Sequence, residues 1–400
     1  MRTLRTLYVL FLLSFSISSV GQQPLTSDLL EESAIRFTLT DQFELTESAK
    51  DQWANLIGDS QFVGLAEVHN SAQLSLFTKA ILPVLEEKGY AHFAFEMGPT
   101  SAQILQDATK NSAETTQNIR KLNREYGKKG ANKTPLVFTN KIEDALFLQE
   151  ASKLGFGFWG LDQEYAFSFE MLIDHLNTNY PQTSEEYKSS YRTAKSKIGA
   201  VIFKNKVEGQ SVYCWYLESK EFSDYFKFFS NSPEAQKIVD DIKKSWKIYC
   251  QHTRGGSNQL RANYMKKNFA NYLLQVGMQS KVLLKFGGIH LTHGISTFGV
   301  DDIGKYVTEI AQKNNTGFLT IRHLIAYRNG KSNIGKSGWK SIGMFLELGR
   351  KDQWTVVDLR PFRKMLKNKE IATNKKYAFE LNSYDLLLLP PDDQYPKVNY

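Results

Sequence analysis

A carboxylate or an imidazole stands within a few residues after each of four short apolar segments, which cover residues 61–66, 91–95, 156–161 and 282–286. In chain order these side chains are Glu67, His69, Glu96, Asp162, Glu164, His290 and His293. If the segments are parallel strands, their carboxyl ends meet at one edge of the sheet, where ligands bind in open α/β folds. The placement therefore predicts one polar site built from strand ends.

Carboxylates beside imidazoles suit two kinds of chemistry. An imidazole with a pKa near 6.5 accepts and returns protons at neutral pH, and a neighbouring carboxylate fixes its tautomer. Mixed carboxylate and imidazole sets also bind zinc, manganese or iron. If a metal is present, we expect its ligands to be Glu67, His69, Glu96 and His290. The residue types alone leave the cofactor open, because they serve with or without a metal.

An arginine has a placement that fits the same site. The segment 257–276 has helical periodicity, and one stripe of that helix carries Arg261, Met265, Asn268 and Tyr272. An arginine on this stripe, just before the segment that leads to His290, either faces the site or lies exposed on a surface helix. Four other histidines lack a strand-end position and are interpreted as structural: His92, His175, His252 and His323.

The elements that must position these residues alternate between strand and helix. Apolar segments also occur at 317–321 and 355–357, and helical patterns cover 71–88 and 142–154. Strands that are apolar on both faces and alternate with helices indicate a mostly parallel sheet covered by helices on both sides. We therefore predict an α/β fold, with a first part at 26–179 and a second part at 256–400. The C-terminal seventy residues are expected to be β-rich.

The stretch 180–255 interrupts this alternation and is interpreted as a helical insertion that caps the sheet. Its aromatic residues either cover a flat or hydrophobic ligand or form a helical core, and they are Tyr213, Trp215, Tyr216, Tyr225, Phe226, Phe228 and Phe229. Cys214 and Cys250 lie in the same region. They form either one disulfide or two separate buried thiols.

The first 22 residues have the pattern of a secretory signal peptide: two arginines, an apolar run at 7–15 and small residues near 18–21. We therefore expect a chain exported to the periplasm or the extracellular space, with no membrane span after processing. The net charge of +8 is spread over lysine-rich segments without interleaved aromatics, which argues against nucleic acid as a partner.

Two glycine motifs fit nucleotide-binding patterns only by their letters. The glycines of 155–160 fall within an apolar strand segment instead of a loop before a helix. The phosphate-loop pattern at 330–337 is followed by a segment that makes a poor helix. Both are interpreted as structural.

With these residues in view, the chain resembles the erythromycin esterase-like family over about 62–294. The family's Gly-Glu-x-x-His-Gly motif is matched by 66–70 with a spacing one residue shorter, and its Gly-x-Asp motif by 160–162. Its Arg-Asp-x-x-Met-x-x-Asn helix is matched by 261–268 without the acid. Its His-Asn-x-His motif is matched by 287–290, where only the last histidine is kept.

The resemblance implies an exported hydrolase that cleaves an ester or lactone in a small, hydrophobic molecule. His69 is then the general base, and Glu67 or Glu96 orients its imidazole. Arg261 and His290 stabilise the oxyanion, and Asp162 positions water or anchors Arg261. The remaining strand-end residues are assigned to substrate binding: Asn70, Glu164 and His293.

The wider superfamily implies two alternatives, because it includes metal-dependent proteases and haem-binding iron-uptake proteins. The first alternative is a metal-dependent hydrolase. The second is a non-enzymatic protein that binds haem or another iron ligand. The sequence leaves the substrate and the oligomeric state open.

Overall fold

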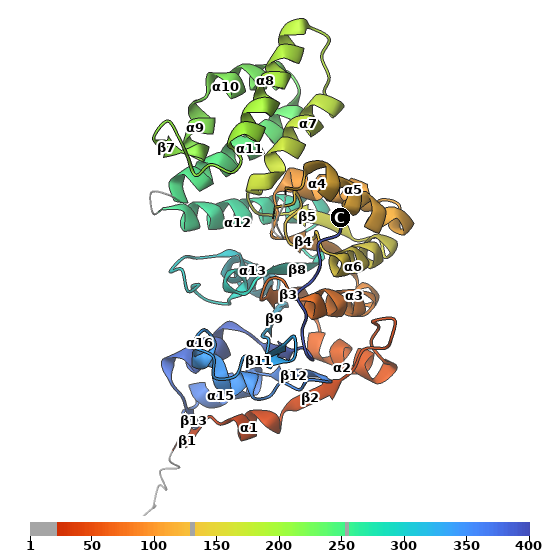
Figure 1. The fold of residues 1–400 in the computed structure, drawn as a ribbon. Helices are drawn as coiled ribbons and strands as arrows, with labels where there is room; N and C mark the ends of the chain where they lie inside the picture. Colours follow the sequence, from red (N-terminus) through yellow and green to blue (C-terminus); the bar gives the residue numbers. More distant parts are fainter. Residues whose placement is uncertain (1–21, 129–132, 253–255) are drawn as a thin grey trace, which may run out of the picture.

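The computed structural model describes residues 22–128, 133–252 and 256–400, and an eight-stranded sheet runs through it (Figure 1). Six neighbouring strands are parallel, and β12 is antiparallel to both of its neighbours. In spatial order the strands are β2 (Ala34–Phe37), β12 (Trp354–Asp358), β14 (Leu386–Leu389), β9 (Gly317–His323), β3 (Ser60–Glu67), β8 (Lys281–Gly287), β4 (Tyr90–Phe95) and β5 (Gly157–Gly160). The predicted α/β fold with a mostly parallel sheet is confirmed.

Helices cover both faces of the sheet, as Figure 1 shows. The helices on one side include α3 (Ala72–Glu87) and α6 (Ile142–Lys153), and those on the other include α12 (Ser257–Val276) and α13 (Ile303–Lys313). Successive strand residues enter opposite layers, since Leu283 belongs to the core under α3 and α6 and Leu284 to the core under α12 and α13. This alternation explains why the strand segments are apolar throughout. Three further helices bury residues in the same core as α3 and α6: α2 (Glu47–Ile57), α4 (Pro99–Thr109) and α5 (Thr115–Tyr126).

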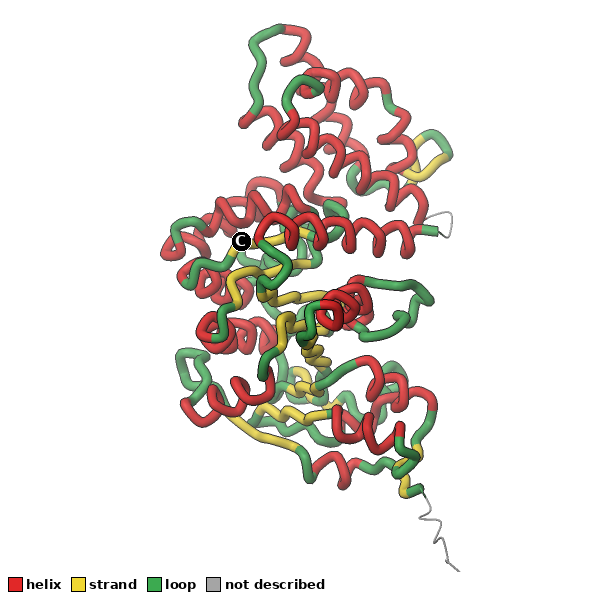
Figure 2. The backbone as a smooth tube through the Cα atoms, turned by 180° about the vertical axis from the view of Figure 1, so that it is seen from behind, coloured by secondary structure: helices red, strands yellow, loops and turns green. Residues whose placement is uncertain are grey.

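A helical lobe forms the cap above α12. Figure 2 shows that it is almost entirely helical, with one short ribbon formed by β6 (Lys206–Val207) and β7 (Gln210–Ser211). Its helices are α7 (Phe169–Asn179), α8 (Glu185–Val201), α9 (Val212–Glu218), α10 (Lys220–Phe226) and α11 (Pro233–His252). The lobe starts at α7, which is earlier than the predicted boundary at 180. Its aromatic residues pack into one cluster around Trp246, which agrees with the helical-core alternative.

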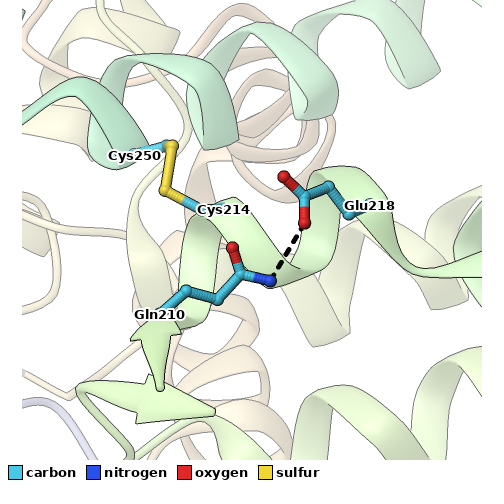
Figure 3. Close-up of a disulfide and its surroundings, with 4 residues drawn as sticks. All are labelled: Gln210, Cys214, Glu218 and Cys250. Carbon is cyan, nitrogen blue, oxygen red and sulfur yellow. Dashed lines mark hydrogen bonds between the residues drawn. A yellow bond between two sulfur atoms is a disulfide. The ribbon is translucent and has the colours of Figure 1, made fainter. Parts of the chain in front are cut away.

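Cys214 and Cys250 form a disulfide that joins α9 to α11 within the cap (Figure 3). Both cysteines are buried. On α9, Glu218 accepts a hydrogen bond from the Gln210 amide at 3.0 Å, which ties the short ribbon to the same helix. Of the two alternatives for the cysteines, the disulfide is the one present.

The C-terminal region differs from the expectation of a β-rich segment. Strands β12 and β14 alternate there with α14 (Gly343–Leu346), α15 (Arg360–Lys367) and α16 (Lys375–Ser383). A short strand, β13 (Ile371–Ala372), pairs in parallel with β1 (Gln23–Pro24), which follows the start of the described residues and precedes α1 (Ser27–Glu31). The region is mixed because two of its strands join the main sheet and need helices to cover them.

The two discounted glycine motifs are structural in the described residues. Gly157–Gly160 forms β5 itself, and the phosphate-loop pattern leads into a 3-10 turn, Lys340–Ile342, and then into α14, which is only four residues long. The predicted signal peptide at 1–22 falls almost entirely outside the described residues. Among the described helices, none combines the length and the apolar character that crossing a membrane requires.

Candidate active site

The end of β3 places a carboxylate between an imidazole and a buried ammonium group. Glu67 Oε1 lies 2.9 Å from His69 Nδ1, and its Oε2 accepts a hydrogen bond of 2.5 Å from Lys285 Nζ. Burial favours protonated Glu67, but Lys285 and His69 outweigh burial and lower the pKa of Glu67 to about 2. Because Glu67 is ionised, Nδ1 of His69 carries the hydrogen, and the neutral ring presents its lone pair at Nε2.

Glu96, just after β4, is the centre of the cluster. Its Oε1 accepts a hydrogen bond of 2.7 Å from Arg261 Nη2, and its Oε2 accepts one of 2.6 Å from the Gly287 backbone. His69 Nε2 lies 3.8 Å from Oε2, beyond hydrogen-bond distance. Burial opposes ionisation of Glu96, but the neighbouring imidazoles and Arg261 outweigh it and lower its pKa to about 2.

Arg261 reaches the cluster from α12, as its helical stripe suggested. Its Nε donates to Asp162 Oδ1 at 2.9 Å, and its Nη2 binds both Asp162 and Glu96. These hydrogen bonds use Nε and Nη2 of Arg261, and Nη1 takes no part in them. Burial opposes the charge of Arg261, but Asp162 and Glu96 outweigh burial and raise its pKa. Asp162 therefore anchors the arginine, one of its two expected roles.

His290 completes the cluster from the turn after β8. Its Nδ1 lies 2.8 Å from Asp302 Oδ2, and its Nε2 lies 3.6 Å from Glu96 Oε1. Asp302 also accepts a hydrogen bond from the backbone of Ile303 and so caps the start of α13. Burial lowers the pKa of His290, but Glu96 and Asp302 outweigh it, and the net shift is upward. Glu96 thus lies between two imidazoles and a guanidinium group.

Gly287 allows these side chains to approach one another. A Cβ atom at this position would lie 2.8 Å from His69 Nε2 and 3.2 Å from Glu96 Oε2. No larger residue fits without moving the imidazole or the carboxylate. Gly287 stands where the erythromycin esterase-like motif His-Asn-x-His has its first histidine, and in this chain the glycine has a steric role.

Phe138 lies against His69 from the loop before α6. Its ring stacks on the imidazole with centroids 3.9 Å apart and planes inclined by 5°. The backbone of Phe138 has φ of 60°, a left-handed conformation that costs a bulky residue roughly 1–2 kcal/mol. Strain of this kind concentrates at functional sites, where the surroundings hold the residue in place.

A buried network supports the loop that carries His69. The backbone N–H of Val68 donates to His323 Nδ1 at 3.3 Å, and Ser71 Oγ lies 3.5 Å from Nε2 of the same ring. Ser71 Oγ donates to Asp393, which also binds Arg328. Burial lowers the pKa of His323 to about 3, so this histidine is neutral and structural, as the sequence indicated.

Of the three residues assigned to substrate binding, Glu164 and His293 lie outside the cluster and Asn70 lies at its margin. Glu164 is fully buried and accepts hydrogen bonds from the backbones of Thr100 and Ser101, which lie in the first turn of α4. It therefore caps a helix. Asn70 lies beside Glu67 in a small polar pocket, and its carbonyl accepts a hydrogen bond from Arg328.

His293 lies against one face of the sheet, away from the strand ends. Its Nε2 is 2.7 Å from Asp385 Oδ2, and its Nδ1 is 3.0 Å from Thr308 Oγ1. Its Nε2 is also 3.2 Å from Thr320, a residue in the middle of β9. Both ring nitrogens have hydrogen-bond partners, which gives His293 a structural role.

The arrangement does not fit the suggested metal ligands. Within 22–128, 133–252 and 256–400, no group of three or more histidine, cysteine, aspartate or glutamate side chains is placed to hold a metal ion. The oxygens of Glu67 are taken by His69 and Lys285, and those of Glu96 by Arg261 and Gly287. The side chains bind one another instead of converging on a common point.

Three residues of the cluster were not predicted from the sequence: Lys285, Asp302 and Phe138. Lys285 has a signal in the sequence, because a lysine inside an otherwise apolar strand must find a buried partner. Asp302 lies at a helix start twelve residues after His290, where it is indistinguishable from an ordinary N-cap. Phe138 sits in an irregular loop and gives no periodic signal.

Comparisons with known proteins support the fold. No family model matches the chain, and no curated protein matches its sequence. A solved structure of a Bacillus cereus protein matches with a TM-score of 0.58 and 13% identity, covering 94% of this chain and 98% of that one. A succinoglycan biosynthesis protein matches with a TM-score of 0.57 and 14% identity over the same shares.

An erythromycin esterase is among the similar structures. A mutant of the esterase EreC in its open conformation matches with a TM-score of 0.56 and 12% identity, covering 90% of this chain and 98% of that one. At these identities the matches establish the architecture alone. The chain has an erythromycin esterase-like α/β fold, as the motifs in its sequence implied.

Proposed function

We propose that the chain is a hydrolase that cleaves an ester or lactone, with His69 as the general base. One observation supports this above all: Nδ1 of His69 is held by an ionised Glu67, while Nε2 has no hydrogen-bond partner among the described residues. The side chain of His69 is 33% exposed, so water and substrate can reach it. An oriented imidazole with an accessible lone pair is what general-base catalysis requires.

In the proposed step, His69 Nε2 takes a proton from water while the water oxygen bonds to the carbonyl carbon. The carbonyl π electrons move to oxygen and form an oxyanion. Arg261 Nη1 and a protonated His290 stabilise that charge. The intermediate then expels the alkoxide, which takes the proton back from the His69 imidazolium. A carboxylic acid and an alcohol result, and the enzyme returns to its initial state.

Export from the cytoplasm is part of the proposal. The N-terminal pattern supports it, and so does the Cys214–Cys250 disulfide, because such bonds persist in oxidising compartments. The metal-dependent alternative gains no support from the geometry of the cluster. The haem-binding alternative stays a prediction, since no feature of the site bears on it.

The test is a panel of chromogenic esters and lactones with the purified wild-type protein, His69→Gln and His92→Gln. His92 is a matched control because it packs against Trp159, outside the cluster. We expect turnover in the wild type and the control and a loss of about a thousandfold in His69→Gln. If His69→Gln keeps its turnover, His69 is not the base. If the wild-type protein turns over no ester or lactone in the panel, the ester and lactone hypothesis is rejected.

A further inference from the structure

Two accessible aromatic rings flank the imidazoles of the cluster. Phe138 is half-buried and stacks on His69. Phe298 is 48% exposed, and its ring centroid lies 6.3 Å from that of His290. Ile295, in the same loop as Phe298, is 51% exposed. These side chains come from two loops, one of which brings Phe138 beside His69 and the other Phe298 beside His290, and both imidazoles lie near Glu96.

The charges of the cluster are already paired. Arg261 is bound to Asp162 and Glu96, and Lys285 is 4% exposed and bound to Glu67. Arg261 Nη1 lies outside these pairs and is assigned to the oxyanion, so the carboxylate of an anionic substrate would meet no further arginine or lysine donor in this cluster. The substrate would instead meet four carboxylates in addition to its own: Glu67, Glu96, Asp162 and Asp302. Like charges at short range in a partly buried site repel strongly.

We propose that Phe138 and Phe298 bind the apolar part of an uncharged ester, and that the acidic cluster excludes esters that carry a carboxylate. This inference rests on the proposed function and specifies its substrate class. The left-handed backbone of Phe138 agrees with it, because the chain keeps a large ring over His69 in a conformation that bulky residues rarely adopt. Aromatic rings next to a polar reaction centre supply apolar contact area with few rotatable bonds.

The experiment uses two esters that differ only in charge. These are 4-nitrophenyl butyrate, which is neutral, and mono(4-nitrophenyl) succinate, which carries a carboxylate at the end of an acyl chain of the same length. We expect the wild-type kcat/KM to be at least about tenfold higher for the neutral ester. An equal or higher kcat/KM for the succinate ester would overturn the inference while leaving the hydrolase assignment in place.

The variants Phe138→Ala and Phe298→Ala test the two rings. Each should lower kcat/KM for the neutral ester by about tenfold and change the succinate ester much less. Phe43→Ala is the matched control, because Phe43 is also partly exposed and also has a left-handed backbone, with φ of 57°, but lies in the turn before α2. Unchanged kinetics in both ring variants would overturn the inference. Phe298 is so exposed that its truncation should not impair folding.

Amide analogues separate this inference from the proposed function. The nitroanilides 4-nitrobutyranilide and 4-nitrosuccinanilic acid resist hydrolysis, and their binding is measured by calorimetry. If no ester is turned over but the neutral anilide binds more tightly than the anionic one and loses affinity in Phe138→Ala, the binding inference stands and the hydrolase assignment fails. Equal binding of the two anilides would overturn the inference.

Discussion

Two groups of the same composition lie in this molecule, and they differ in what they leave accessible. Each consists of a histidine, a carboxylate and a cation. One is His69–Glu67–Lys285, at the carboxyl ends of β3 and β8. The other is His293–Asp385–Arg363, against the face of the sheet. In both, the imidazole is bound to the carboxylate and the carboxylate is bound to the cation.

The difference lies in the second ring nitrogen. His293 uses both nitrogens, on Asp385 and Thr308, and the hydroxyl of Thr308 donates in turn to the backbone of its own helix. His69 uses only Nδ1, and its side chain is 33% exposed against 16% for His293. A histidine–carboxylate pair is therefore no evidence of catalysis by itself. The accessible lone pair separates a candidate base from a structural histidine.

The largest expected effect contrasts the two histidines directly. His69→Gln should lower kcat/KM for an ester substrate by about a thousandfold, because a general base contributes between about a hundredfold and ten thousandfold. His293→Gln should leave kcat/KM within about threefold, because its ring does not reach the cluster. Initial rates at saturating and limiting substrate would measure both. Equal losses in the two variants would remove the distinction between them.

The second prediction concerns the two cations. Lys285→Met leaves a buried carboxylate without its ammonium partner and should lower the free energy of unfolding by about 3–5 kcal/mol. Arg363→Met should cost about 1 kcal/mol, because the Arg363 side chain is 29% exposed and water can replace part of its interaction. Urea denaturation followed by circular dichroism measures both. A larger loss in Arg363→Met would mean that Lys285 is not needed to balance the charge of Glu67.

Glu67→Gln is the control for this second prediction. It removes the negative charge that Lys285 compensates, so the double variant Glu67→Gln/Lys285→Met should lose less stability than the sum of the two single variants. Additive losses would show that the two side chains do not act as a pair.

The third prediction concerns the stability role of His293. His293→Gln should lower the free energy of unfolding by about 1–3 kcal/mol, because it disturbs the partners of a buried aspartate. Burial opposes ionisation of Asp385, but His293 and Arg363 outweigh it and lower its pKa to about 2. This aspartate therefore stabilises the fold at neutral pH and loses that effect as the pH falls from about 4 towards 2. Acid unfolding of His293→Gln should accordingly begin at a higher pH than that of the wild type.

The sequence predicted the helices and strands better than it predicted which side chains contact one another. The segments at 61–66 and 257–276 are β3 and α12 to within one residue at each end, because apolar runs and helical periodicity are local properties. Glu67, His69, Glu96, Asp162 and His290 do lie together with Arg261. The rule that parallel strands end at one edge was enough to bring them together.

The contacts that the sequence did not predict join residues that are far apart in the chain. Lys285 meets Glu67 across 218 positions, and Asp385 meets His293 across 92. No local pattern encodes such pairs. Glu164 and His293 follow strands just as the cluster residues do, but their side chains are satisfied by the start of α4 and by Asp385. Position after a strand thus selects candidates, and hydrogen-bond satisfaction decides among them.

The smallest expected effect is the pH dependence of stability at His69. Burial lowers the pKa of its imidazole, but Glu67 and Glu96 outweigh burial and raise it above its ordinary value of 6.5. The folded state therefore binds the proton more tightly than the unfolded chain, and the stabilisation is fully present below about pH 6.5 and lost as the pH rises through the raised pKa.

His69→Gln should accordingly lower the free energy of unfolding most near pH 5, by about 1 kcal/mol, and least near pH 9. The free energy of unfolding of both proteins across this range measures the difference, and kcat/KM should rise with pH through the same raised pKa because only the neutral imidazole accepts a proton. A stability difference that grew with pH would mean that the folded state favours the neutral ring. The Glu67–His69 contact would then not be an ion pair in the folded state.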